Sequence, residues 1–167
     1  MSHDFIIALA ALATSVISLV ASIHFSRLAQ EHNRKSVLPL PYVECSDYVN
    51  RLEVRIWNHG TGPMLVRSLT AADARQSDAQ IMRIIPKPPA CYRFADYGNF
   101  EEPRPIPPGA HAVIIAAELD PQREEHRTYH ATLRAFLAQT TIRCVYTDVY
   151  GTPFADHIIR LAWFGRN

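Results

Sequence analysis

Cysteine is scarce in this sequence, and neither sign of charge is in excess. Three cysteines among 167 residues are too few and too scattered to staple a disulfide-rich scaffold. Lys and Arg total 17 against 16 Asp and Glu, so the net charge is +1, whereas a dedicated nucleic-acid binder carries a basic excess. With 48% apolar and 20% charged residues, the composition is that of a chain that folds and not of a disordered tail.

The motifs of common catalytic sites are also missing. The chain has no Gly-x-Ser-x-Gly nucleophile elbow, no glycine-rich phosphate loop with a lysine and no His-Glu-x-x-His zinc motif. The best metal candidate is the pair His126 and His130, four residues apart on an expected helix, but such histidines more often pack with a bonded nitrogen. Cys45 and Cys144 fall at strand positions, where a thiol usually behaves as a small buried hydrophobe. We therefore expect no catalytic residue, no metal and no cofactor.

A long uncharged run lies near the N-terminus. From Phe5 to Phe25, 21 consecutive residues carry no formal charge, and as a helix they would span about 31 Å, the thickness of a bilayer's hydrocarbon core. Eleven of them are Leu, Ile, Phe or Val, with insertion free energies that sum to roughly −3 to −6 kcal/mol. The run lacks the polar stripe of a buried soluble helix. It also lacks the basic start of a cleaved signal peptide, and cleavage as a signal peptide is the alternative. We predict an uncleaved transmembrane anchor over residues 1–26.

The flanks of this run predict its orientation. No Lys or Arg precedes it, whereas Arg27, Arg34 and Lys35 follow it and would mark the membrane boundary. Because positive charge resists translocation, we expect the N-terminus outside and the C-terminal part in the cytoplasm, a reducing compartment that suits unpaired cysteines. Residues 27–37 are expected to form a juxtamembrane helix or linker, since Glu31 stands four residues from both Arg27 and Lys35.

Small side chains recur along one side of the anchor. They are Ala10, Ala11, Thr14, Ser15, Ser18 and Ser22. Small residues on one face let a second helix backbone approach closely, so that protein contacts replace lipid contacts. We predict a helix–helix contact here, with a second copy or a different membrane protein, although Ala and Ser are also common in membrane helices without such a contact.

Residues 38–167 have the pattern of a mainly β domain. Apolar and polar residues alternate over Leu52–Trp57, as in a strand with one buried face. The turn-rich segment 58–63 then leads into Met64–Thr70, which predicts a hairpin. Further strands are expected over Ile81–Ile85, Cys91–Phe94, Ala112–Ala117, Ile142–Thr147 and Asp156–Phe164.

A proline-rich loop and one helix interrupt the predicted strands. Seven of the twelve prolines lie between Pro86 and Pro108, and aromatic side chains in such a loop are candidate anchors for a partner. These partner-contact candidates are Tyr92, Phe94, Tyr97 and Phe100. The alternative is that these four aromatic side chains cover the hydrophobic core. A helix is expected over Pro121–Ala138, with Asp120 as its N-cap and proline at its first position.

Turn residues give the domain a resemblance. Asn-His-Gly-Thr-Gly-Pro at 58–63 follows a strand, Pro-Pro-Gly at 107–109 precedes an apolar strand, and Tyr-Thr-Asp-Val-Tyr-Gly occupies 146–151. With Ser-Val-Leu-Pro at 36–39 after a basic stretch, the pattern resembles uncharacterised bacterial single-span membrane proteins that carry an immunoglobulin-like or fibronectin-like domain. The resemblance implies an immunoglobulin-like antiparallel β-sandwich of about seven or eight strands with one inserted helix. It implies no catalytic residue.

These patterns together predict a non-enzymatic accessory or scaffolding subunit that docks on and stabilises a larger membrane protein complex, for example an energy-transducing one. The expected location is the bacterial inner membrane, crossed once, with the β domain in the cytoplasm. Expected partners are the bilayer and other membrane subunits or a second copy, and not nucleic acid. The alternative is a membrane-tethered sensor whose sandwich binds a small ligand or peptide in a concave pocket and signals through the helix.

Overall fold

The computed structural model describes residues 3–90 and 92–166, and the chain divides into two compact units, Met1–Val37 and Leu38–Asn167. The first unit is one helix, α1, which spans His3–Ser36. Among the described residues, α1 is the one helix long and apolar enough to cross a membrane, with a mean hydropathy of 2.4 over its most apolar window. A signal sequence would satisfy the same criterion.

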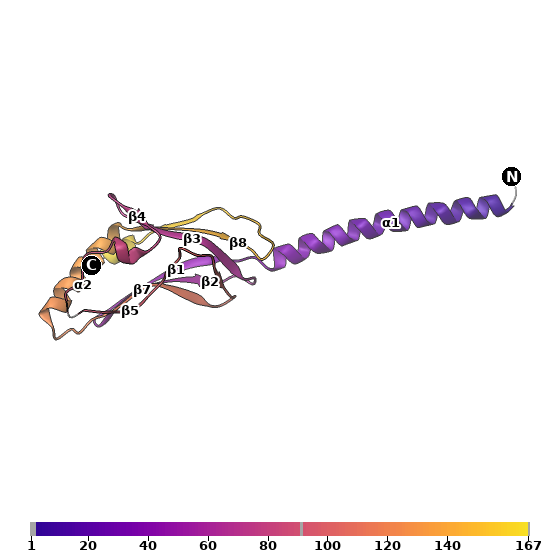
Figure 1. Cartoon of the computed structure of the whole chain (residues 1–167). Helices are drawn as coiled ribbons and strands as arrows, with labels where there is room; N and C mark the ends of the chain where they lie inside the picture. The colour runs from indigo at the N-terminus through magenta and orange to yellow at the C-terminus, as the bar shows by residue number, and fades with distance from the viewer. Residues whose placement is uncertain (1–2, 91, 167) are drawn as a thin grey trace. The chain divides into compact units, whose positions relative to one another are not determined.

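The second unit is mainly β with a helix, as predicted, and contains two antiparallel sheets (Figure 1). The first sheet has the order β1-β2-β7-β5, and the second has the order β4-β3-β8-β9, with β6 paired to β3. The strands are β1 Pro41–Tyr48, β2 Arg51–Asn58, β3 Met64–Ala72, β4 Ser77–Asp78, β5 Phe94–Tyr97, β6 Arg104–Ile106, β7 His111–Glu118, β8 Thr141–Thr147 and β9 His157–Arg160. The helices are α2 Glu124–Gln139 and the 3₁₀ turns η1 Ile81–Arg83 and η2 Ala162–Gly165.

Both sheets and α2 contribute to one hydrophobic core. On β2, the alternating apolar residues Leu52, Val54 and Ile56 are fully buried, as the period of a strand requires. On α2, Leu133 and Leu137 are fully buried four residues apart on one helix face. The predicted strands over residues 52–57, 64–70, 112–117 and 142–147 are confirmed as β2, β3, β7 and β8, and β8 pairs with β9.

The predicted hairpin around residues 58–63 is wrong. β2 pairs with β1 and β7 in one sheet, whereas β3 pairs with β4, β6 and β8 in the other. The segment is therefore a connection between sheets. Its geometry is fixed by the fully buried Asn58, whose side chain donates to the carbonyls of Gly62 and Ile106 at 2.8 and 3.0 Å. The Ile106 partner lies 48 positions further along the chain, which explains why a local pattern did not reveal the change of sheet.

Three further segments differ from their predictions. Residues 81–85 contain the 3₁₀ turn η1 in place of a strand, because Ile81 and Ile84 both enter the core at a spacing of three. The strand predicted over 91–94 begins only at Phe94, as β5, and Cys91 lies outside the described residues. The last predicted strand divides into β9 and η2.

The helix α2 begins later than predicted. Its first residue is Glu124 and its N-cap is Arg123, which makes no side-chain capping bond. Asp120, the predicted cap, instead accepts the backbone N–H of Gln122 through its carboxylate at 3.0 Å and the N–H of Arg123 through its carbonyl at 3.1 Å. Asp120 therefore closes a turn that precedes the helix.

Candidate functional site

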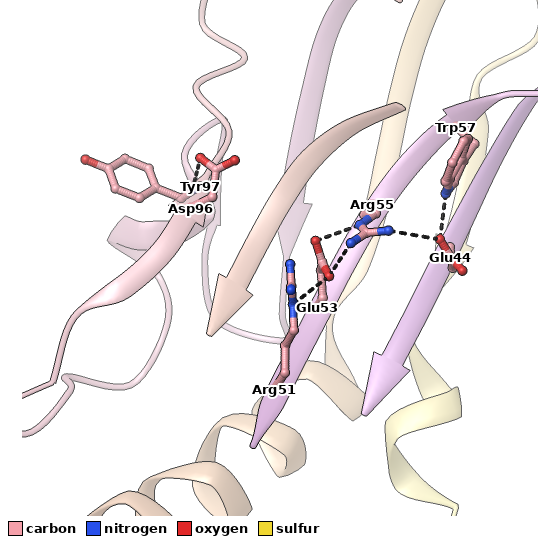
Figure 2. Close-up of polar contacts among 7 residues, drawn as sticks. All are labelled: Glu44, Arg51, Glu53, Arg55, Trp57, Asp96 and Tyr97. Carbon is pink, nitrogen blue, oxygen red and sulfur yellow. Dashed lines mark hydrogen bonds and ion pairs between the residues drawn. The ribbon is translucent and has the colours of Figure 1, made fainter. Parts of the chain in front are cut away.

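A row of polar side chains crosses the outer face of the first sheet. Because side chains alternate along β2, the residues between its buried positions point away from the core, and the register places Glu44 of β1 beside Arg55 of β2. Figure 2 shows these side chains following one another across β1 and β2. We call the row the charged ladder; its members are Glu44, Arg51, Glu53, Arg55 and Trp57.

Glu53 is the centre of the charged ladder. Nε and Nη2 of Arg55 donate to its two carboxylate oxygens at 2.6 and 2.7 Å, the bidentate geometry of the strongest ion pairs. Nε of Arg51 lies 3.0 Å from Oε2 of Glu53, as an ion pair that is not aligned for a hydrogen bond. Only 4% of the Glu53 side chain is exposed, and a carboxylate so withdrawn from water is costly unless it is paired. The hydrogen bonds that Arg55 donates to Glu53 raise the pKa of Arg55 above its ordinary value.

Aromatic rings extend the charged ladder toward one end of β2. Nε1 of Trp57 donates to Oε2 of Glu44 at 2.6 Å, and Nη1 of Arg55 lies 4.0 Å from the same oxygen. The Trp57 ring stacks on His59, with centroids 5.7 Å apart, and lies 4.4 Å from the His111 ring. Tryptophan and arginine are enriched in protein interfaces. Since the Glu44 and Arg55 side chains remain 39% and 27% exposed, the charged ladder combines fixed geometry with access from outside.

Sequence reasoning missed the charged ladder, although part of its signal was present. Glu53 and Arg55 stand two positions apart in the strand predicted over Leu52–Trp57, so their opposite charges had to share one face. Arg51 stands two positions before Glu53 and just outside the predicted strand. The contribution of Glu44 depends on the pairing register of β1 with β2, which the sequence pattern did not supply.

Of the four predicted partner-contact aromatic residues, three pack in or against the core and one is exposed. Tyr92 and Phe100 are buried, at 6% and 1% exposure, and Phe94 packs partly buried against the core. Tyr97 is 56% exposed, and Figure 2 shows it on β5, pointing away from the charged ladder. Burial of the other three follows from contacts that composition does not reveal, such as the Tyr92 ring 5.0 Å from that of Tyr129 on α2.

The candidate metal-binding histidines have structural partners. Nδ1 of His126 accepts the backbone N–H of Asp120 at 3.0 Å. Nε2 of His130 lies 2.8 Å from Oδ1 of Asp47, a bond that ties α2 to β1. Within residues 3–90 and 92–166, no group of three or more His, Cys, Asp or Glu side chains is arranged to hold a metal ion.

Burial lowers the reactivity of two cysteine thiols. Desolvation raises the pKa of Cys144 to about 12, and that of Cys45 to about 11, with a smaller contribution from Glu44. Both therefore remain protonated near neutral pH, where the thiol is a poor nucleophile.

A groove of about 620 Å³ lies between the proline-rich loop and α2. The hydroxyl of Tyr129 donates to the carbonyl of Pro86 at 2.9 Å and thereby fixes the loop to the helix. The volume is within the range of small-ligand sites, although the groove is shallow and largely open to solvent. The groove is lined by Lys87, Pro88, Pro89, Glu124, Glu125, Thr128, Tyr129 and Thr132.

The predicted helix-packing and membrane-boundary residues all lie on α1, with exposed side chains. The hydroxyls of Thr14 and Ser15 donate to the carbonyls four residues earlier at 2.9 and 2.8 Å, which lowers the cost of placing them in lipid. Nζ of Lys35 lies 2.8 Å from Glu31. Contact of this helix with another remains a prediction.

The chain matches no protein-family model, and no curated protein matches its sequence.

Proposed function

We propose that this chain is a membrane-tethered accessory subunit whose β module binds a protein partner through the charged ladder. The observation that carries the proposal is the fixed, partly desolvated row Arg51–Glu53–Arg55, which ends in Trp57 on an accessible sheet face. Side chains already held in one geometry lose little conformational entropy when a partner binds. Alternating charges favour a partner with the complementary pattern and disfavour others.

The proposed tether is α1. We propose that it crosses the bacterial inner membrane once, with the N-terminus outside, because Arg27, Arg34 and Lys35 follow its apolar run. Its small-residue side would contact a helix of the same partner or of a second copy. Confinement to the bilayer raises the effective concentration of the partners, so that a contact of modest affinity is sufficient.

We further propose that the β module is immunoglobulin-like. Constant-type immunoglobulin domains place strands A, B, E and D in one sheet and C, F and G in the other. Lettered in chain order, β1, β2, β7 and β5 take the positions A, B, E and D, and β3, β8 and β9 take C, F and G, which supports the proposal. α2 then falls in the E–F connection, and β4 and β6 are additions beside β3.

Photocrosslinking in intact native membranes tests the partner contact. A photoreactive amino acid replaces Ser46, which pairs with Glu53 across β1 and β2. The matched control replaces Ile158, which is 62% exposed on β9 of the other sheet. We expect one discrete protein adduct from position 46 and none from position 158. Equal adducts at the two positions, or no adduct at position 46 in the native host, would contradict the proposal.

The groove beside α2 favours a second candidate function, ligand sensing. A sensor needs a concave site for its ligand, and the groove supplies a volume of about 620 Å³. Replacing Thr128 with Trp would fill the groove without touching the charged ladder. A sensor would then lose its response to the ligand, whereas the proposed accessory subunit would keep its adduct from position 46.

A further inference from the structure

One end of the β module is built from four segments without a formally charged residue. Residues 38–42, 59–63, 107–111 and 149–153 contain no Asp, Glu, Lys or Arg, although 20% of the whole chain is charged. We call these four segments the uncharged end.

Backbone hydrogen bonds hold the first two segments together. The N–H of His59 donates to the carbonyl of Leu40 at 2.8 Å, and the N–H of Thr61 donates to that of Leu38 at 3.0 Å. The close approach depends on Gly60, because a Cβ there would lie 2.1 Å from the Leu38 carbonyl oxygen.

The other two segments lie at the same end of the sheets. Gly109 in the third segment donates its N–H to the carbonyl of Asn58 at 2.8 Å. The fourth segment follows the end of β8, where Thr147 pairs with Leu65, and Leu65 stands at the start of β3 just after the second segment.

The uncharged end exposes large apolar and aromatic side chains. Leu38, Leu40, Tyr42, Val149 and Tyr150 are each between 44% and 59% exposed. Hydrogen bonds fix the backbone of the fourth segment. The carboxylate of Asp148, itself only 2% exposed, accepts the backbone N–H groups of Tyr150 and Thr152 at 2.8 Å each. Exposed apolar side chains that gather at one end of a module often mark a surface that is covered in the working protein.

The opposite end of the module carries many charged residues. It is formed by the turns between β1 and β2 and between β3 and β4 and by the segment from β7 to α2. Charged side chains there include Asp73, Arg75, Glu118, Asp120, Arg123, Glu124 and Glu125. Tyr48 and Val49 are also exposed at this end, at 64% and 77%, but they stand among charged residues. The two ends therefore differ in charge and not in the exposure of single apolar side chains.

The path of the chain indicates what covers the uncharged end. Leu40 follows Ser36, the last residue of α1, by four positions, which limits their separation to about 14 Å. The eleven residues 26–36 lift the end of the helix about 16 Å above the apolar run if it stands upright, and less if it is tilted. The linker can therefore return the module to the headgroup layer, where tyrosine and tryptophan side chains concentrate.

We propose that the uncharged end rests on the headgroup layer of the bilayer that α1 crosses, so that the membrane itself is a second binding partner of the β module. The inference depends on the proposed anchoring by α1. The charged ladder runs along β2 from Trp57 near the uncharged end toward Arg51 at the other. With the uncharged end on the membrane, β2 would rise from the surface over about 26 Å. The charged ladder would then face sideways, toward neighbours in the same membrane.

Fluorescence quenching of the full chain in nanodiscs tests the inference. Both native tryptophans are replaced by phenylalanine, and a single tryptophan is introduced as Tyr150→Trp at the uncharged end. The matched control is Tyr48→Trp, an exposed tyrosine at the opposite end of β1. The nanodisc lipid is phosphatidylcholine brominated near the headgroup end of its acyl chains, and identical unbrominated discs supply the reference emission.

We expect a loss of emission from the tryptophan at position 150 and unchanged emission from the one at position 48. Equal emission at position 150 in brominated and unbrominated discs would overturn the inference. A third variant, Leu12→Trp on α1, separates this failure from that of the anchor: quenching at position 12 alone leaves the anchor and removes the contact, whereas no quenching at position 12 removes both. Native Trp57, kept in a Trp163→Phe chain, repeats the measurement without disturbing the bond to Glu44, and its quenching is expected as well.

Discussion

Replacement of Asn58 by alanine is expected to destabilise the β module strongly. Asn58 is fully buried, and its amide uses its whole hydrogen-bonding capacity. The nitrogen donates to the carbonyls of Gly62 and Ile106, and the oxygen accepts the backbone N–H groups of Leu40 and Gly60 at 3.1 and 3.0 Å. One side chain thereby joins the start of β1, the connection between the sheets and β6.

The expected cost follows from these four bonds. A typical intramolecular hydrogen bond contributes about 0.5–1.5 kcal/mol net, and a buried group left without a partner costs more. Leu40 is 59% exposed, so water can reach part of the vacated site and recover some of the loss. We therefore expect Asn58→Ala to lower the free energy of unfolding by about 3 kcal/mol.

Denaturant unfolding of the full chain in detergent micelles measures this cost. Trp57 and Trp163 both lie in the β module, so their fluorescence reports its unfolding. The matched control is Asn99→Ala, since Asn99 is exposed and its side chain accepts one hydrogen bond, from the N–H of Glu101 at 3.0 Å. We expect the control to lose less than about 1 kcal/mol. An equal loss in the two variants would refute the assignment of Asn58 as the residue that fastens this end of the module.

Three further predictions concern single side chains. Gly60→Ala is expected to cost about 1–3 kcal/mol in unfolding free energy, because its Cβ would collide with the Leu38 carbonyl, whereas the control Gly165→Ala meets its nearest neighbour at an ordinary 3.5 Å. Burial lowers the pKa of His157 below its ordinary 6.5. As the pH drops below 6.5, the unfolded chain therefore protonates this imidazole before the folded chain does, and the free energy of unfolding falls. His157→Gln should reduce this fall when unfolding is measured as a function of pH, and an unchanged profile would contradict the lowered pKa. Burial raises the pKa of Cys144 to about 12, so peptide mass spectrometry should find it unalkylated by iodoacetamide at pH 7.5 until denaturant is added, and rapid native labelling would contradict its burial.

Strand positions were predictable where burial follows a local period. The alternation of Leu52, Val54 and Ile56 with polar residues is preserved in the structure, with all three side chains fully buried. Within the helix predicted over Pro121–Ala138, the apolar residues Leu133 and Leu137 likewise recur at the spacing of one helix face, although the start of the helix was misplaced by the turn that Asp120 closes. In both cases, the information lies within a few residues of chain, and the core needs only one face of each element.

The arrangement of these elements depends on contacts that a local pattern does not contain. Segment 58–63 has the turn residues of a hairpin, but the buried bond from Asn58 to Ile106 helps turn it into a connection between sheets. Tyr92 and Tyr97 share the same proline-rich loop, yet one is buried against α2 and the other is exposed. The candidate site has the same limit, since Glu44 joins Arg55 only through the register of β1 with β2.

The charged ladder is a costly way to stabilise a sheet, and this bears on its role. Replacing a desolvated ion pair with apolar residues of similar volume is often neutral or stabilising, so such a pair is weak evidence of a contribution to stability. Cross-strand pairs of β-branched or aromatic residues would stabilise the same outer face without desolvating the Glu53 carboxylate. What apolar pairs would not supply is a fixed order of charges along β2, with Arg51 and Arg55 on either side of Glu53. A fixed order of charges selects among partners. This supports the proposed role of the charged ladder in recognition, and we expect its loss to change partner adducts more than the stability of the fold.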